Sequence, residues 1–83
     1  MFPAMTPGQC KAARALLDMT QPALASASGV SLRTIVNFEG GNRTPMPANL
    51  KAIQRALEGA GIIFIAENGD GPGVRLRKDQ SLR

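Results

Sequence analysis

Two short apolar-periodic segments on either side of a single glycine, Gly29, constrain the fold of this chain more than any other feature. The first segment covers residues 20–28 and the second covers residues 31–38. Glycine adopts a left-handed backbone conformation without strain, so it can end one helix and let the chain turn at once into the next. The sequence therefore predicts two helices joined by a tight turn. The arrangement could be plain bundle packing, or a way of presenting the second helix to something outside the protein.

Capping residues indicate where the predicted helices begin. Thr6 and Gln9 have the spacing of a capping box, and Pro7 lies at the first helical position. Thr20 and Ser31 are suited to cap the second and third helices. The expected helices are residues 7–17, 21–28, 32–38 and 47–60.

Apolar spacing predicts the buried face of each helix. In the third helix Ile35 and Phe38 point one way, whereas Arg33, Thr34 and Asn37 point another. The expected inward residues, in chain order, are Cys10, Ala13, Leu16, Leu17, Leu24, Ala25, Ile35, Phe38, Leu50, Ile53, Leu57 and Ala60.

A β-hairpin is predicted after the helices. Residues 62–66 are β-branched and aromatic, residues 68–73 are rich in turn-forming glycine, and residues 74–77 alternate apolar and basic side chains. An isolated hairpin is marginally stable in water, so this one must pack on helices of its own chain or pair with a second copy. Its apolar run has residues for both faces, which favours pairing. The expected organisation is a flexible arm at 1–5, a helical domain at 6–60, a dimerisation hairpin at 61–78 and a frayed tail at 79–83.

The charge balance suits a polyanionic partner, although many small basic proteins bind none. The 83 residues carry a formal net charge of +4, and Lys and Arg that neutralise phosphates release condensed counterions. The sequence has no His and a single cysteine, Cys10, so it offers no Cys/His zinc site and no internal disulfide. Cys10 fits a buried position, with a redox sensor as the alternative. Since the acidic residues are scattered and no cofactor motif is present, we expect neither catalysis nor a cofactor or metal.

The sequence also bears on location. No apolar run approaches the roughly 20 residues that a membrane span needs, and the N-terminal MFPAM lacks the charged and apolar regions of a signal peptide. We therefore expect a cytoplasmic protein with no membrane partner.

Residues 20–45 carry a spaced pattern that resembles one family. The pattern reads Q-x-x-L-A from Gln21, G-V-S from Gly29, T-I at Thr34 and E-x-G from Glu39, followed by Arg43 and Pro45. It is similar to the lambda-repressor/Cro-like helix-turn-helix transcriptional regulators of the xenobiotic response element type. With the flanking helices the resemblance covers residues 6–60, and the hairpin resembles C-terminal additions in some small bacterial members. The resemblance implies a mainly α, lambda-repressor-like domain of four to five helices, and we expect its C-terminal hairpin to pair across a dimer.

The resemblance also implies which residues contact DNA, with an ordinary polar surface as the alternative for each. The third helix would enter the major groove, where Arg can bond guanine bidentately. The expected base-contacting residues are Arg33, Thr34, Asn37 and Leu32, and the expected phosphate-contacting residues are Gln21, Ser31, Asn42, Arg43 and Thr44.

Two further sets of residues have expected structural roles. Arg14 and Glu39 match positions that form an ion pair in many members of the family. The expected dimer interface consists of Ile62, Ile63, Phe64, Ile65, Val74 and Leu76. Pairing these strands with a second copy would remove exposed sheet edges.

Together these features predict a sequence-specific regulator of transcription. We expect it to bind double-stranded DNA as a homodimer and to repress from an inverted-repeat operator, although binding placed upstream of a promoter could also activate. The alternative is an antitoxin-like or other partner-binding protein that also regulates its own promoter and engages a protein antagonist or toxin.

Overall fold

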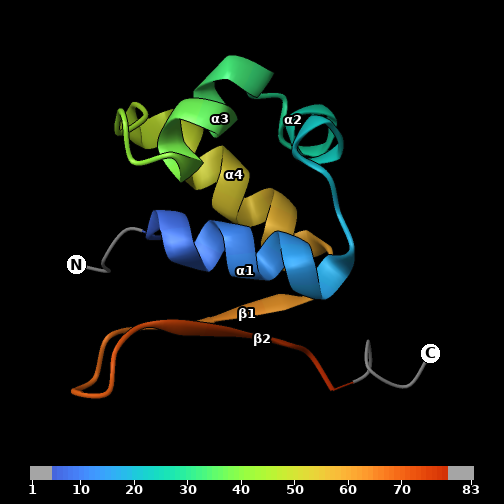
Figure 1. Ribbon diagram of the computed structural model, residues 1–83. Helices are drawn as coiled ribbons and strands as arrows, with labels where there is room; N and C mark the ends of the chain where they lie inside the picture. The colour runs from blue at the N-terminus through green and yellow to red at the C-terminus, as the bar shows by residue number, and fades with distance from the viewer. Residues whose placement is uncertain (1–4, 79–83) are drawn as a thin grey trace.

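The computed structural model describes residues 5–78, which form four helices and a two-stranded hairpin. Residues 1–4 of the arm expected at 1–5, and the tail expected at 79–83, lie outside the described residues. The mainly helical fold with a C-terminal hairpin is confirmed (Figure 1). The elements are α1 (Pro7–Leu17), α2 (Gln21–Ser28), α3 (Leu32–Glu39), α4 (Pro47–Gly59), β1 (Ile62–Ile65) and β2 (Gly73–Leu76).

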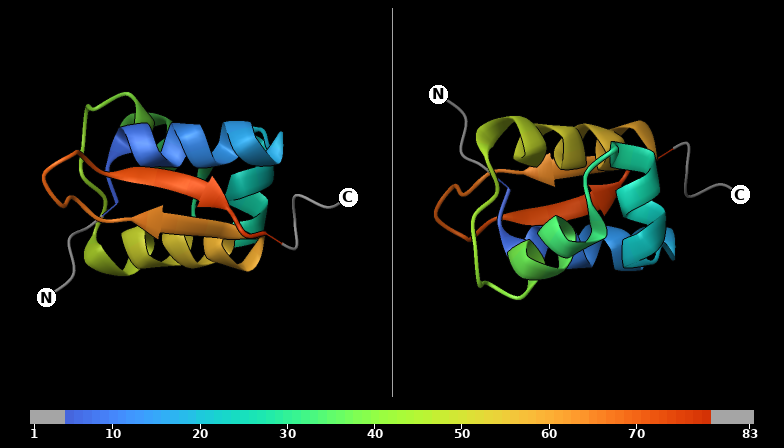
Figure 2. Two further views of the ribbon diagram at one scale, coloured as in Figure 1. Left: turned by 90° about the horizontal axis from the view of Figure 1, so that it is seen from below. Right: turned by 90° about the horizontal axis from the view of Figure 1, so that it is seen from above.

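The elements lie in three layers. Helices α1 and α4 form the middle layer, with α2 and α3 on one side and the hairpin on the other (Figure 1). Strand β2 runs along α1 and strand β1 runs along α4, as Figure 2 shows from below. The hairpin therefore packs on the helices of its own chain and lies on the opposite side of the molecule from α3.

The predicted caps are present. The Thr6 hydroxyl accepts a hydrogen bond from the Gln9 N–H at 3.0 Å, and the Gln9 side-chain oxygen accepts one from the Thr6 N–H at 2.9 Å. Thr20 and Ser31 accept hydrogen bonds from backbone N–H groups in the first turns of α2 and α3. Gly29 ends α2 with a φ of 74°, which a side chain would strain. Contacts between residues close in the sequence therefore set where α1, α2 and α3 begin and where α2 ends.

The hydrophobic core joins all the layers. Leu24, Ile35, Ile53 and Leu57 have no exposed surface, as the apolar spacing predicts. The expectation for Leu16 is wrong, because its side chain is 45% exposed. Leu16 lies at the edge of the stripe that α1 buries, since each residue turns the helix by about 100°.

Met5 does not belong to a loose arm. Only 5% of its surface is exposed, and it joins the core cluster directly before α1. The prediction of a flexible arm is therefore wrong at Met5.

The hairpin has a regular antiparallel register, in which Ile62 pairs with Leu76 and Phe64 pairs with Val74. These four side chains face the helices: Ile62 is in the core and the other three pack against it. Each strand starts or ends within one residue of its predicted bounds. Successive strand residues point to opposite faces, so the side chains between these pairs lie on the outer face of the hairpin.

A buried glutamine ties α1 to the turn end of the hairpin. The Gln9 side-chain amide donates to the carbonyl oxygen of Ile65 at 3.2 Å and to that of Gly73 at 3.0 Å. Buried polar groups need such partners. Gln9 therefore serves both the α1 cap and the attachment of the hairpin.

Candidate nucleic-acid interface

The outer side of α3 is not covered by the described part of the chain. Ile35, Phe38 and Glu39 are buried against the other helices, whereas Leu32 is 42% and Val36 43% exposed. The right-hand view of Figure 2 looks onto α2 and α3 from this side. A helix held in this way can enter a groove without any rearrangement of the fold.

A first groove borders α3 on the side of the loop that follows it. Its volume is about 260 Å³. It brings together three predicted base-contacting residues and two predicted phosphate-contacting residues with side chains from the start of α4. The lining residues are Arg33, Thr34, Asn37, Arg43, Thr44, Pro45, Met46 and Asn49.

Asn42 and Ser31 have structural partners near this groove. The Asn42 N–H donates to the Asn37 carbonyl oxygen at 2.9 Å and so closes the end of α3. The Ser31 hydroxyl accepts from the Thr34 N–H and shares a hydrogen bond of 2.8 Å with the Thr34 hydroxyl. The two hydroxyls therefore fix each other's position at the start of α3.

A second, more open groove borders α3 on the side of α2. It is lined by the start of α2, by one face of α1 and by Val36 of α3. Lys11 contributes the exposed cation of this groove, and the sequence analysis missed it. Its position five residues before Leu16 in α1 carries no local signal, because only the packing of α1 against α2 and α3 brings Lys11 to this face.

Most of the charged side chains around α3 are positive. The linings of the two grooves contain Lys11, Arg14, Arg33 and Arg43, and Glu39 is their one carboxylate. Glu39 is buried and paired with Arg14. The surface that flanks α3 is therefore positively charged.

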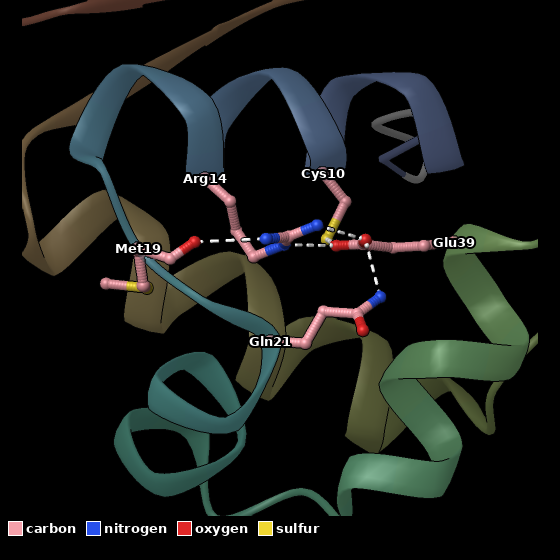
Figure 3. Close-up of polar contacts among 5 residues, drawn as sticks. All are labelled: Cys10, Arg14, Met19, Gln21 and Glu39. Atoms are coloured by element: carbon pink, nitrogen blue, oxygen red, sulfur yellow. Dashed lines mark hydrogen bonds and ion pairs between the residues drawn. The ribbon is translucent and has the colours of Figure 1, made fainter.

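Glu39 receives hydrogen bonds from α1 and α2 (Figure 3). Arg14 donates to its two oxygens at 2.8 Å and 2.6 Å, which is the expected ion pair. The Cys10 thiol donates at 3.0 Å and the Gln21 amide at 3.0 Å. Arg14 also donates to the Met19 carbonyl oxygen at 3.0 Å. Gln21 therefore has a structural partner beside the second groove.

Cys10, Arg14, Gln21 and Glu39 form a hydrogen-bonded cluster. Its contacts shift the pKa values of Glu39 and Cys10. Burial raises the pKa of the Glu39 carboxyl, but hydrogen bonds from Arg14, Cys10 and Gln21, together with the charge of Arg14, outweigh burial and lower the pKa overall. Burial, with the hydrogen bond to Glu39 and its negative charge, raises the pKa of the Cys10 thiol far above its usual value. Glu39 is therefore ionised and Cys10 protonated near neutral pH.

The residues expected at the dimer interface lie on both faces of the hairpin. Ile62 is 2% exposed in the described chain, so its side chain is a core residue, and its role at a dimer interface stays a prediction. The alternation along β1 turns Ile62 toward the helices. Phe64, Val74 and Leu76 are partly buried against the same core, and Ile63 and Ile65 lie on the other face of the hairpin.

The tight turn between α2 and α3, the uncovered α3 and the positive surface beside it define a helix-turn-helix DNA-binding domain. A family model described as helix-turn-helix matches residues 11–59, which is more than half of the chain. The chain belongs to the lambda-repressor/Cro-like helix-turn-helix family, and it is a DNA-binding regulator of that type. A comparison with curated proteins found no match.

Residues 5–78 contain neither a candidate membrane span nor a candidate metal cluster. None of the helices there has the length and apolar character needed to cross a membrane. Within the same residues, no group of three or more His, Cys, Asp or Glu side chains could hold a metal ion.

Proposed function

We propose that the protein binds a specific double-stranded DNA sequence as a homodimer and represses transcription by occupying an inverted-repeat operator. The observation that carries this proposal is the uncovered outer side of α3 with positively charged grooves on both flanks. The B-DNA major groove is wide enough for an α-helix, and its base edges differ between all four base pairs.

Arg33 is the principal base reader in this proposal. It is exposed and lies close to the middle of the outer side of α3, opposite the buried Ile35 and Phe38. Its guanidinium can donate to O6 and N7 of guanine together. Asn37 follows one turn later and can pair with adenine or reach a phosphate. Thr34 offers a methyl and a hydroxyl at the edge of the same row.

The two grooves beside α3 suit the two phosphate backbones that border the major groove. Arg43 and Thr44 line one groove, with Asn42 next to them in the chain. Lys11 and Gln21 line the other. Such contacts fix the register of a protein on DNA and supply affinity without choosing the sequence.

The hairpin is the proposed dimerisation element. Each strand has one neighbour in the described sheet, so each has one unpaired edge. The β1 side borders an apolar groove of about 630 Å³, lined in part by Ile63 and Phe64. Pairing there with a second copy would cover the groove and continue the sheet. Two-fold dimers of such domains place their α3 helices in successive major grooves about 34 Å apart.

Selection of bound duplexes from a random DNA pool, with the purified protein alone, tests this function. We expect an enriched inverted repeat whose half-sites are separated by about one helical turn. Recovery of random sequence would contradict the proposal. Sequence-specific binding without a second protein would also favour a simple regulator over an antitoxin-like protein.

The dimer is tested with Ile63→Asp, and Leu16→Asp serves as a control because Leu16 is an exposed apolar residue on α1. Analytical ultracentrifugation should show a monomer for the first variant and a dimer for the second. Circular dichroism would establish that both variants are folded. A dimer for folded Ile63→Asp would contradict the proposed interface.

A further inference from the structure

The outer side of α3 carries an apolar row beside its polar row. Of the described residues, four large hydrophobic side chains are exposed, and two of them, Leu32 and Val36, lie one turn apart on α3. Residues four apart share a helix face, so Leu32 and Val36 form one row, and Arg33 and Asn37 form the next.

The two rows face different flanks of α3. Arg33 and Asn37 line the groove on the side of the loop, and Val36 lines the groove on the side of α2. If α3 lies in a major groove, the polar row is nearer one strand of the DNA and the apolar row is nearer the other.

We propose that Val36, with Leu32 one turn before it, recognises the 5-methyl group of thymine in each half-site. This inference rests on the proposed DNA-binding function. Thymine is the one base that presents a methyl group in the major groove. Against any other base edge, an apolar row would take hydrogen-bonding groups out of water and give them no partner.

The stiffness of Val36 suits this role. Its side chain branches at Cβ and is held in one strongly preferred rotamer in a helix. Its methyl groups therefore lie in a fixed place when α3 enters the groove, and little side-chain entropy is lost on contact. Because neighbouring rows of α3 reach neighbouring base pairs, the preferred half-site should hold a thymine next to or one step away from the guanine that Arg33 reads.

Replacing thymine by deoxyuridine tests the inference, because it removes the methyl group and leaves base pairing intact. In the duplex preferred by the wild-type protein, each thymine is replaced in turn and affinity is measured by fluorescence anisotropy. At one thymine or more per half-site, affinity should fall about fourfold, the effect of burying one methyl-sized apolar group.

Val36→Ala should bind the thymine duplex about as weakly as the wild type binds the deoxyuridine duplex, and should no longer distinguish the two. Leu16→Ala, which removes an exposed apolar side chain from α1, should retain the full difference. Both residues are exposed, so both variants should fold, and circular dichroism checks this.

Two results would overturn the inference while leaving DNA recognition intact. One is a preferred half-site whose thymines are all insensitive to the exchange, and the other is a sensitivity that Val36→Ala leaves unchanged. Failure of the proposed function is a different result, since no duplex would then be preferred at all.

Discussion

Arg14 holds Glu39 at two points, with Nε 2.8 Å from Oε2 and Nη2 2.6 Å from Oε1. Arg14 belongs to α1, and Glu39 is the last residue of α3. A bidentate contact of this kind fixes orientation as well as distance. Gln21 at the start of α2 donates to the same carboxylate, so one buried side chain sets the position of α3 relative to two other helices.

Glu39→Ala should lower the free energy of unfolding by about 3 kcal/mol, because it removes one partner of a largely buried ion pair and the carboxylate to which Arg14, Gln21 and Cys10 donate. Urea titration followed by circular dichroism measures the change. Glu58→Ala is the matched control, since Glu58 is exposed on α4. This change should stay within about 0.5 kcal/mol. Equal effects of the two substitutions would show that the cluster does not hold the fold together.

The lowered pKa of Glu39 makes stability depend on pH in a definite direction. The folded state releases the proton of Glu39 more readily than the unfolded state does, so this contribution is present above the unfolded pKa of about 4.3 and is lost as the pH falls below it toward the folded pKa. Glu39→Gln should therefore differ most from the wild type near neutral pH, and the difference should shrink as the pH falls below the unfolded pKa. A difference that stayed constant over this range would contradict the ionised state of Glu39.

Cys10 should react slowly in the folded protein. It has no exposed surface, and burial together with Glu39 keeps the thiol protonated, whereas the thiolate is the reactive form. Labelling with iodoacetamide should be slow in buffer and fast in concentrated urea, as measured by mass spectrometry. Because the chain has one cysteine, the added mass reports this site alone. Rapid labelling of the folded protein would instead favour the redox-sensor alternative.

Local chemistry was sufficient to predict most of the fold. Thr6, Thr20 and Ser31 cap their helices through residues three positions later, and Gly29 supplies the left-handed turn. These features act over a few residues, so they can be read in the sequence. The inward faces followed from apolar spacing for the same reason, with Leu16 as the exception.

Contacts between distant residues were harder to predict. Gln9 reaches carbonyl groups 56 and 64 residues away, and Cys10 reaches Glu39 across 29 residues. No local period carries such information, and the Arg14–Glu39 pair was anticipated through resemblance to a family alone. The exposure of Val36 was missed, although the turn of about 100° per residue already places Val36 away from the helix face of Ile35 and Phe38.

Arg43→Ala should weaken binding to all duplexes by a similar factor and leave their ranking unchanged, because Arg43 is proposed to contact phosphate. The plot of log affinity against log salt concentration should become less steep by about one unit. Arg75→Ala removes the same charge from an exposed position on the hairpin and should leave the slope unchanged. A change of base preference in Arg43→Ala would contradict its assignment to the backbone.

The most direct test of the central claim, that α3 reads base edges, compares DNA selected by the wild-type protein with DNA selected by Arg33→Ala. Arg33 is exposed on α3, so its loss should leave the fold intact. The account predicts that the variant selects the same inverted repeat with its preference for guanine lost at one position in each half-site. Unchanged preferences at every position would show that α3 does not read DNA in the proposed register.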